Sequence, residues 1–456
     1  MSGHRAAGPE PVTIAESAAD VLFDVVLHPY VDRCLDLQHG GYLVDFDAQG
    51  QPNGPHRKTL EHAGRTTLAF ALLNRALPQS GFAQHVEHGL RFLRDRMWDH
   101  DHGGFYALVD REGTPLWNGL KHPHGVTYAV RAIVLGSEVL GETESTRWVS
   151  DALKWLDGVC WDTKYDGYRG TFRRDNSPYL DGESVPTDFG DDPLGLRVGM
   201  LEFNTQGDVV HTLVDALVLG GLEVARPRLE TLTNRTLQVV QPNGVLPFLL
   251  LPDWTPTPTP SRTGHQFQLV RRIVAAGEAI GRQEETHDAA LRLALHGLRL
   301  GRHPDGGYPL EMSSNGRMWS TDGSMADSRQ WWVQLEALDA FAFLAAHPAT
   351  PTSIADELTV AASHQWEFFE RCFVDRVHGG IYEYPRSSSL PATPAAHAAN
   401  HRTLRGRLGI RRPEVPAAEP LSAAKHHGWK DISHEVAVLL DLAAGSDRLA
   451  GGFRSS

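Results

Sequence analysis

A short glycine-centred phrase returns six times along this chain and limits the folds that it can adopt. Successive phrases lie 63, 63, about 77, about 63 and 73 residues apart, a spacing longer than that of the common solenoid repeats. Each phrase lies between two segments with helical periodicity, so the sequence predicts six helix pairs. The six phrases are His39-Gly40-Gly41-Tyr42, His102-Gly103-Gly104-Phe105, Tyr165-Asp166-Gly167-Tyr168, Pro242-Asn243-Gly244-Val245, Asp305-Gly306-Gly307-Tyr308 and His378-Gly379-Gly380-Ile381.

The two helices of each predicted pair differ in composition. The second helices are rich in Ala, Leu and Val, and a helix that is apolar on most sides is buried on most sides. We therefore expect an all-α closed barrel, with the second helices lining its inside and short hairpin-like loops such as 105–110 between elements. The first helices are expected at 13–31, 82–98, 145–158, 225–238, 284–300 and 352–373, and the second at 61–78, 122–140, 208–221, 265–281, 328–346 and 432–445.

A repeat that runs the length of the chain favours a single domain over residues 1–456. Three segments break the repeat. Residues 173–206 and 250–263 are expected to be long loops, and residues 385–424, rich in Pro, Ala, Ser and Arg, are expected to be a mobile loop or an oligomer contact. A closed barrel leaves one central cavity, a common place for a small-molecule site.

Composition and charge limit the classes of partner that we expect this protein to bind. With 43 basic and 56 acidic residues the net charge is −13, which disfavours nucleic acid. No apolar run approaches 18 residues, so we expect no membrane span. The N-terminus lacks a signal-peptide core, which favours a cytoplasmic location. We expect a monomer or a homodimer. The three cysteines, Cys34, Cys160 and Cys372, are too few and too separated for a disulfide framework or a zinc site.

Polar residues concentrate where the inner helices are expected to begin, since four of the six helices place a histidine there. These histidines are His124, His211, His265 and His434, with Arg65 and Trp331-Trp332 in the other two units. Converging imidazoles suit either metal binding or proton transfer near neutral pH. The paired spacing of a histidine metal helix is absent, so we favour proton transfer and predict no metal and no cofactor.

Aromatic residues beside these histidines favour a carbohydrate ligand. Trp331, Trp332 and Trp429 could stack on the C–H faces of a sugar, and Arg65 could hold its oxygens. His124 and Gln334, at two of the same predicted helix starts, are further candidates for substrate binding.

Four segments carry a resemblance to the N-acylglucosamine 2-epimerase family, which includes sugar 2-epimerases and aldose–ketose isomerases. Residues 329–338 resemble the family's WWPQAEAL phrase, and residues 264–267 resemble its PGH segment. Residues 428–434 resemble its WK-x-x-x-H segment, and residues 58–65 resemble the phrase that ends in Gln-Ala-Arg. The likeness covers residues 15–445 and implies an (α/α)6 barrel of six helix hairpins that acts as a cofactor-independent sugar isomerase or epimerase.

The resemblance also implies roles for single residues. His265 and His434 match the acid/base pair, His211 matches a third active-site histidine, and Arg65 matches an arginine that contacts substrate oxygens. By the same resemblance, the candidate substrate-binding residues include Asn204, Gln268 and Glu336. The implied mechanism removes the C2 proton of an open-chain aldose of the mannose, glucose or fructose type. The resulting cis-enediol(ate) is reprotonated at C2 to give the epimer or at C1 to give the ketose.

This chain departs from the family's pattern at three positions. Gln268 stands where the family usually has Glu, and His124 where it often has Tyr. The family's Asn, four residues before the third histidine, is Gly207 here, and the nearest Asn is Asn204.

Two alternatives of other classes stay open at this level. One is a glycoside hydrolase, which needs two carboxylates flanking the scissile bond; Glu61, Asp188, Asp208 and Glu336 are the candidates. The other is a sugar-binding protein without catalytic activity. Within the leading hypothesis, the sequence does not separate epimerase from isomerase.

Overall fold

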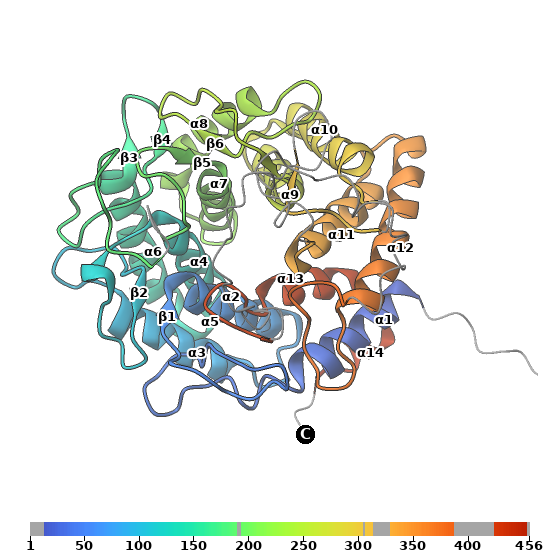
Figure 1. The fold of residues 1–456 in the computed structure, drawn as a ribbon, viewed down its shortest axis with the longest axis horizontal. Helices are drawn as coiled ribbons and strands as arrows, with labels where there is room; N and C mark the ends of the chain where they lie inside the picture. The colour runs from blue at the N-terminus through green and yellow to red at the C-terminus, as the bar shows by residue number, and fades with distance from the viewer. Residues whose placement is uncertain (1–12, 189–192, 304–305, 313–328, 387–423, 454–456) are drawn as a thin grey trace, which may run out of the picture.

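The computed structural model describes residues 13–188, 193–303, 306–312, 329–386 and 424–453. Six inner helices form a closed ring, in which each packs against the next and the last returns to the first. The ring and its central opening are seen end-on in Figure 1. The inner helices are α2 (Leu60–Ala76), α4 (Pro123–Leu135), α7 (Phe203–Val218), α9 (Thr263–Ile280), α11 (Trp331–Ala346) and α13 (Ser433–Leu442).

An outer layer of helices covers this ring, so the predicted (α/α)6 barrel is confirmed. Three of the outer helices end in a π-helical turn, which explains why their predicted ranges run on past the α-helix. The outer layer consists of α1 (Ile14–Asp20) with η1 (Val21–Leu27), α3 (Ala83–Phe92) with η2 (Leu93–Met97), α6 (Glu142–Trp155) with η4 (Leu156–Cys160), α8 (Arg226–Val239), α10 (Gln283–Leu300) and α12 (Thr352–Phe373). Short helical segments are η3 (Trp117–Gly119), α5 (Ser137–Leu140), η5 (Glu223–Ala225) and α14 (Asp447–Ala450).

Within the described ranges, eight two-residue strands pair into four antiparallel ribbons. In three of them, the strand directly before an inner helix pairs with a strand of the following repeat, which fixes where that helix begins. The fourth ribbon pairs β3 with β4, and β4 consists of the last two residues of the third glycine phrase. The strands are β1 (Lys58–Thr59), β2 (Leu108–Val109), β3 (Trp161–Asp162), β4 (Gly167–Tyr168), β5 (Leu201–Glu202), β6 (Leu249–Leu250), β7 (Ser261–Arg262) and β8 (Glu311–Met312).

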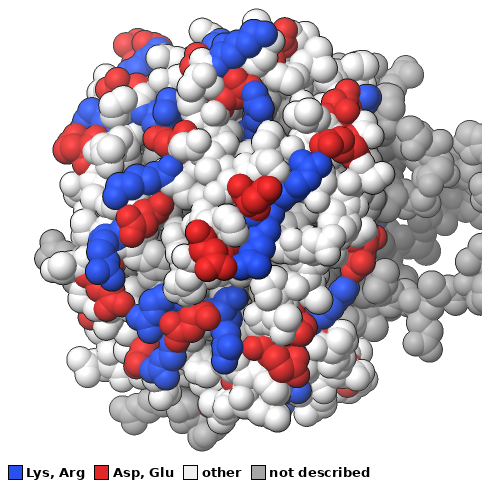
Figure 2. Space-filling view, turned by 90° about the vertical axis from the view of Figure 1, so that its left-hand side faces the viewer, with Lys and Arg blue, Asp and Glu red and all other residues white. Residues whose placement is uncertain are grey.

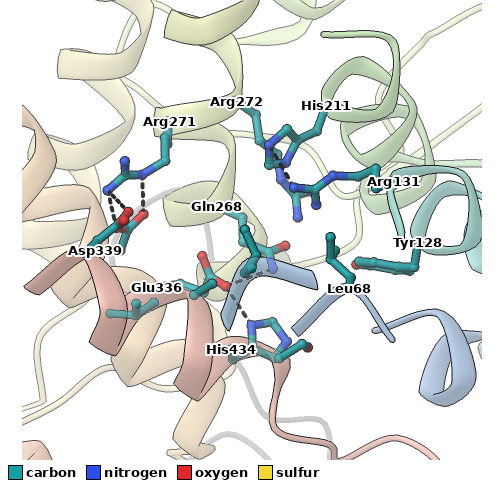
Figure 3. Close-up of a pocket in the computed structure, with 15 residues that line it drawn as sticks. Leu68, Tyr128, Arg131, His211, Gln268, Arg271, Arg272, Glu336, Asp339 and His434 are labelled. Atoms are coloured by element: carbon teal, nitrogen blue, oxygen red, sulfur yellow. Dashed lines mark hydrogen bonds and ion pairs between the residues drawn. The ribbon is translucent and has the colours of Figure 1, made fainter. Parts of the chain in front are cut away.

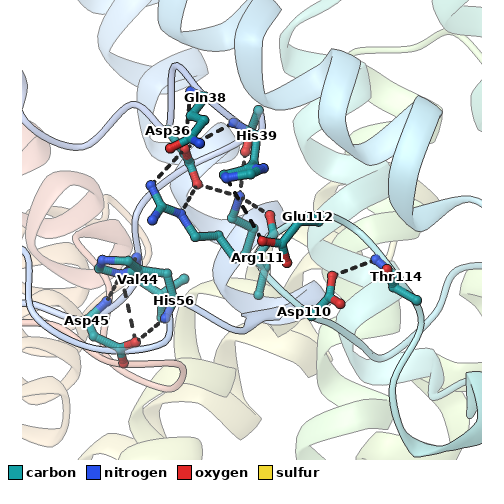
Figure 4. Close-up of polar contacts among 12 residues, drawn as sticks. Asp36, Gln38, His39, Val44, Asp45, His56, Asp110, Arg111, Glu112 and Thr114 are labelled. Atoms are coloured by element: carbon teal, nitrogen blue, oxygen red, sulfur yellow. Dashed lines mark hydrogen bonds and ion pairs between the residues drawn. The ribbon is translucent and has the colours of Figure 1, made fainter.

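The glycine phrases are tight turns that the next repeat holds in place. In the first, the backbone N–H of Asp36 donates to the carbonyl of Gly41 (2.9 Å), and the Asp36 carboxylate accepts from the buried Lys58 ammonium (3.1 Å) and from Arg111 (2.8 Å). Figure 4 shows the Asp36 carboxylate within this polar cluster. The same acid–lysine pair recurs as Asp99–Lys121 (3.0 Å) and Asp375–Lys425 (2.6 Å).

Glycine is required in these turns for two reasons. Gly104 has a φ of +75°, in the left-handed region that side chains disfavour. A Cβ at this position would also lie 2.3 Å from the ring of Trp155. The turn therefore packs directly against an outer helix, which accounts for the recurrence of the phrase.

The surface carries charges of both signs. On the face at the left of Figure 1, acidic and basic side chains are interspersed, as Figure 2 shows. Exposed ion pairs such as Arg94–Glu144 (2.8 Å) and Arg174–Asp101 (2.7 Å) contribute little individually to stability. Within the described part of the chain, no helix has the length and apolar character needed to cross a bilayer. The predicted loop at 385–424 lies almost wholly outside the described residues.

Candidate active site

The first turns of the inner helices surround a cavity of about 330 Å³, within the usual size range of small-molecule sites. Every inner helix contributes a side chain to its wall. From these helices the cavity is lined by Arg65, His124, Asn204, His265, Gln268, Trp331, Trp332 and His434, and from the surrounding loops by Pro193, Leu194, Arg262, Leu310, Gln330, Glu383, His427 and Trp429.

Nine of the twelve predicted site residues line this cavity, namely Arg65, His124, Asn204, His265, Gln268, Trp331, Trp332, Trp429 and His434. His211 and Glu336 line a smaller cavity of about 120 Å³ deeper along the inner helices, and Gln334 lines neither. Gln268 and His434 border both cavities, so they belong to the layer of side chains that separates the two.

His434, Glu336 and Gln268 form a hydrogen-bonded row in that layer (Figure 3). The Nδ1 atom of His434 lies 2.7 Å from Oε1 of Glu336, and the side-chain amide of Gln268 donates to the same oxygen at 3.0 Å. Because a carboxylate only accepts, Nδ1 of His434 carries the hydrogen, which leaves the lone pair on Nε2 in the neutral ring. This arrangement suits a general base with a carboxylate that orients it.

His265 has a different environment, built from aromatic rings. Its ring stacks on Phe248 at 5.3 Å with an interplanar angle of 7°, and lies 5.0 Å from the ring of Trp332. Its Nδ1 is buried without a hydrogen-bond partner among the residues that the structure describes. Burial, and next the positive charge of Arg262, lower the pKa of His265 well below its usual value, so the imidazole is neutral at physiological pH.

His124 lies between two buried carboxylates. Its Nδ1 is 3.2 Å from Glu61 and its Nε2 is 3.1 Å from Asp208. Burial lowers the pKa of His124, but its hydrogen bonds to Asp208 and Glu61 outweigh that effect and raise the pKa to about 9. His124 is therefore a fixed cation at neutral pH, with both ring nitrogens engaged.

Further charged and polar side chains complete this cluster. Asp208 pairs with Arg272 (2.5 Å) and accepts from the hydroxyl of Tyr128 (2.9 Å). Tyr128 in turn accepts from Arg65 (3.0 Å), whose guanidinium lies over the tyrosine ring. Arg65 is thereby held at the cavity wall from which we expect it to contact substrate.

The sequence analysis did not identify the side chains that hold His124 and Arg65 in place, although a four-residue spacing in the inner helices could have revealed them. The second residue of each inner helix and the residue four positions later lie one turn apart on the same face. The resulting pairs are Glu61 and Arg65, His124 and Tyr128, Asn204 and Asp208, Gly264 and Gln268, Trp332 and Glu336, and His434 and Val438. Tyr128 and Arg272 were missed altogether, and Glu61 and Asp208 were considered only as hydrolase carboxylates.

The predicted equivalence of four histidines is wrong for His211. Helix α7 begins at Phe203 instead of residue 208, so His211 is its ninth residue, more than two turns from the mouth. There His211 accepts from Arg131 (3.1 Å) and lines the smaller cavity (Figure 3). The equivalent position in α7 is Asn204, and the residue four positions later is Asp208.

Gln334 lies away from both cavities and holds a glycine turn. Its carboxamide accepts from the backbone N–H of Tyr308 and donates to the carbonyl of the same residue, both at 2.8 Å. Gln206 makes the same pair of bonds with Tyr168. The structure thus places Gln334 among the residues that join the helix layers.

Glu61, His122 and His124 are close enough to share a metal ion, and several of their ligand atoms also contact one another or neighbouring groups. Nδ1 of His122 accepts from the backbone N–H of His124 (3.3 Å), so its Nε2 carries the hydrogen and faces Glu202 at 3.4 Å. His124 is occupied on both sides by carboxylates. The cluster is therefore a charge-paired network that supports the cavity wall.

Comparison with known proteins finds a similarity to sugar epimerases over part of the chain. Residues 41–183 match the family model described as N-acylglucosamine 2-epimerase (GlcNAc 2-epimerase). A curated relative, the cellobiose 2-epimerase of Dictyoglomus turgidum, is 28% identical over 147 residues, which span 32% of this chain and 36% of the relative. The aligned segment thus spans about a third of that relative's length.

Solved structures share the fold over nearly the whole chain. The cellobiose 2-epimerase of Bacillus thermoamylovorans matches with a TM-score of 0.75 and 18% identity, covering 94% of this chain and 98% of that one. A D-mannose isomerase matches with a TM-score of 0.72 and 16% identity, covering 94% and 96%. These structures show the same fold, and the family-model match over residues 41–183 agrees with the resemblance to the N-acylglucosamine 2-epimerase family found in the sequence.

Proposed function

We propose that this protein is a carbohydrate isomerase that interconverts an aldose with its C2 epimer or its ketose by histidine-mediated proton transfer. The observation that carries the proposal is the meeting of His434, backed by Glu336, with His265 in one cavity of the barrel. The family match and the epimerases and isomerases among the similar structures support the same reaction class.

The chemistry follows from the groups on the cavity wall. A neutral imidazole removes the proton from C2 of the open-chain sugar, and the electron pair forms the C1=C2 bond of a cis-enediolate. Arg65, which Tyr128 holds in place, stabilises the charge that develops on the sugar oxygens. Imidazoles and carboxylates move all the protons, so this route needs no cofactor.

The indole rings of the cavity support a sugar as the substrate. Trp331, Trp332 and Trp429 line the same space as the histidines, and Trp332 lies beside both His265 and His434. Stacking on these rings would place a sugar's reacting carbons near both imidazoles.

The test is incubation of unlabelled sugars with the protein in D₂O, followed by NMR. Mannose, glucose, fructose, lyxose, cellobiose, N-acetylmannosamine and sulfoquinovose form a suitable panel. We expect deuterium at C1 or C2 of one substrate class, and the position names the product. Binding of a sugar without exchange would instead identify a binding protein without catalytic activity.

The hydrolase alternative receives no support from its four candidate carboxylates. Glu61 and Asp208 both bind His124, and Glu336 binds His434 and Gln268. Asp188 pairs with Arg57 (2.8 Å), and both side chains are about half exposed. Release of new reducing ends from oligosaccharides, without deuterium exchange, would revive this alternative.

A further inference from the structure

Four histidines line the cavity of about 330 Å³, and they differ in their capacity to move a proton. His124 has both ring nitrogens bound to carboxylates. His427 is also engaged on both sides, since its Nε2 faces Glu383 (3.2 Å) and its Nδ1 accepts from the backbone N–H of Trp429 (3.3 Å). Neither of these two rings has a nitrogen available for a substrate proton.

The other two differ in whether a carboxylate supports them. His434 has Glu336 on Nδ1, while its Nε2 makes no hydrogen bond to any residue in the described ranges. A carboxylate partner both fixes the tautomer and stabilises the imidazolium that forms when the ring takes a proton. His265 packs against two aromatic rings and, among the described side chains, has no carboxylate within ion-pair distance. A charged form of His265 would therefore be poorly stabilised.

Gln268 contributes to the difference between His434 and His265 because its side chain is neutral. Its amide donates to Oε1 of Glu336, the same oxygen that faces Nδ1 of His434. A carboxylate in place of Gln268 would lie about 3 Å from Glu336, and two such groups would share one proton instead of both ionising. The row from Gln268 to His434 thus supports a single proton acceptor.

We propose, building on the function proposed above, that His434 alone moves the carbon-bound proton and that the protein is an aldose–ketose isomerase instead of a 2-epimerase. Nε2 of His434 takes the proton from C2, and the C2–H electrons form the C1=C2 bond while O1 takes the charge. After its Nε2 proton exchanges with solvent, the same imidazolium delivers a proton to C1, and the O2 hydroxyl proton passes to O1. One C–H bond breaks, one forms, and nothing is oxidised or reduced overall.

Epimerisation would instead require a second group to protonate C2 from the opposite face. His265 is the remaining imidazole with unengaged nitrogens on the described cavity wall, and it is neutral there. Its contribution in this proposal is to hold a sugar oxygen. Gln268 is a positioning residue, since it acts on the reaction through Glu336.

The first test follows the initial products from the unaltered protein. An aldose that exchanges deuterium is incubated in D₂O, and NMR is recorded while less than a tenth has reacted. We expect the ketose, with deuterium at C1, to form at least ten times faster than the C2 epimer. An epimer that forms as fast as the ketose, without a lag, would overturn the one-base proposal but leave the proposed function intact. Absence of exchange with every sugar of the panel would defeat both.

The second test addresses Gln268 with two variants of similar size. Gln268→Met removes the hydrogen bond, and Gln268→Glu adds a carboxylate beside Glu336. We expect kcat to fall at least tenfold in both, with KM within about twofold, and the pH dependence of kcat to change in Gln268→Glu, because the introduced carboxyl group and Glu336 would share a proton. A purely structural role would leave the pH profile unchanged. An unaltered kcat in Gln268→Met, or an unaltered profile in Gln268→Glu, would contradict the positioning role.

Discussion

Trp332 lies beside both His434 and His265, but the two histidines have different partners. His434 donates a hydrogen bond to a carboxylate, whereas His265 packs against two aromatic rings. A general base gains from a partner that stabilises its protonated form, and a ring in an apolar stack does not have one. The two imidazoles are thus suited to separate tasks.

Substitution of the two histidines should separate these tasks. We expect His434→Gln to lower kcat by about 10²- to 10⁴-fold, the usual contribution of a positioned general base. His265→Gln should have a smaller effect on kcat and raise KM, because His265 then only holds substrate. Steady-state kinetics on the sugar identified by deuterium exchange measure both values. Unchanged turnover in both variants would exclude histidine-mediated proton transfer.

His124 illustrates a buried charge whose role is to support the site. Its pKa of about 9 in the folded protein exceeds the unfolded value of 6.5, so its charge stabilises the folded state. That contribution is complete below pH 6.5 and is lost as the pH rises through 9. The cavity wall at Arg65 and Tyr128 should therefore be weakest in alkaline solution.

Urea unfolding of His124→Gln tests this dependence. Between pH 6 and 9.5 the unaltered protein should lose about 3 kcal/mol more of its free energy of unfolding than the variant, since each pKa unit corresponds to about 1.4 kcal/mol. At pH 7 the variant itself should be about 3–5 kcal/mol less stable, because two buried carboxylates lose their counter-ion. Arg94→Ala, which removes an exposed ion pair, is the control and should change stability by less than about 1 kcal/mol. Parallel pH curves for the variant and the unaltered protein would refute the interpretation.

At the scale of helices, apolar periodicity predicted the elements well because the packing of the two layers produces that periodicity. The last outer helix was predicted at 352–373, and α12 spans Thr352–Phe373. The start of α7 was missed because Asn204-Thr205-Gln206-Gly207 has the polar composition of a loop. In the structure these residues are buried, since Gln206 bonds the backbone of Tyr168 and Asn204 lines the cavity.

The pairing of Gln206 and Gln334 with glycine turns also escaped prediction, because it joins residues 38 and 26 positions apart through a single side chain. Periodicity within one helix carries no information on such a contact. The WWPQ-like phrase made Gln334 a candidate for substrate binding, and its place at the Tyr308 turn indicates a structural contribution.

Gln334→Met distinguishes the two roles of this glutamine. The change keeps the side-chain volume but leaves the backbone N–H of Tyr308 without its acceptor, which should lower the free energy of unfolding by about 1–3 kcal/mol. Since Gln334 lines neither cavity, kcat/KM should stay within about threefold of the unaltered protein. Gln206→Met is the matched variant and should behave alike. A large rise in KM with unchanged stability would restore the predicted substrate contact.

Over the whole molecule, closure of the ring depends on the shortest inner helix. Helix α13 lies between α11 and α2, and its outer side is covered by α1 from the other end of the chain. Arg448 of α14 binds Asp20 and Asp24 of the first outer segment, which further joins the C-terminal to the N-terminal region. The glycine repeat indicated six units, but only the structure shows how the sixth meets the first.

If residues 1–456 form the single domain predicted from the repeat, truncating a buried side chain of α13 should destabilise the entire barrel. Leu439 is fully buried in this helix, and Leu439→Ala should lower the free energy of unfolding by about 2–5 kcal/mol. Tryptophan fluorescence, from indoles spread over several repeats, and far-UV circular dichroism should shift to the same lower midpoint. Val360→Ala, at a position 55% exposed on α12, is the control and should stay within about 0.5 kcal/mol. Two separate transitions, with only one moved by Leu439→Ala, would show that the repeats unfold in independent blocks and that closure at α13 does not unite them.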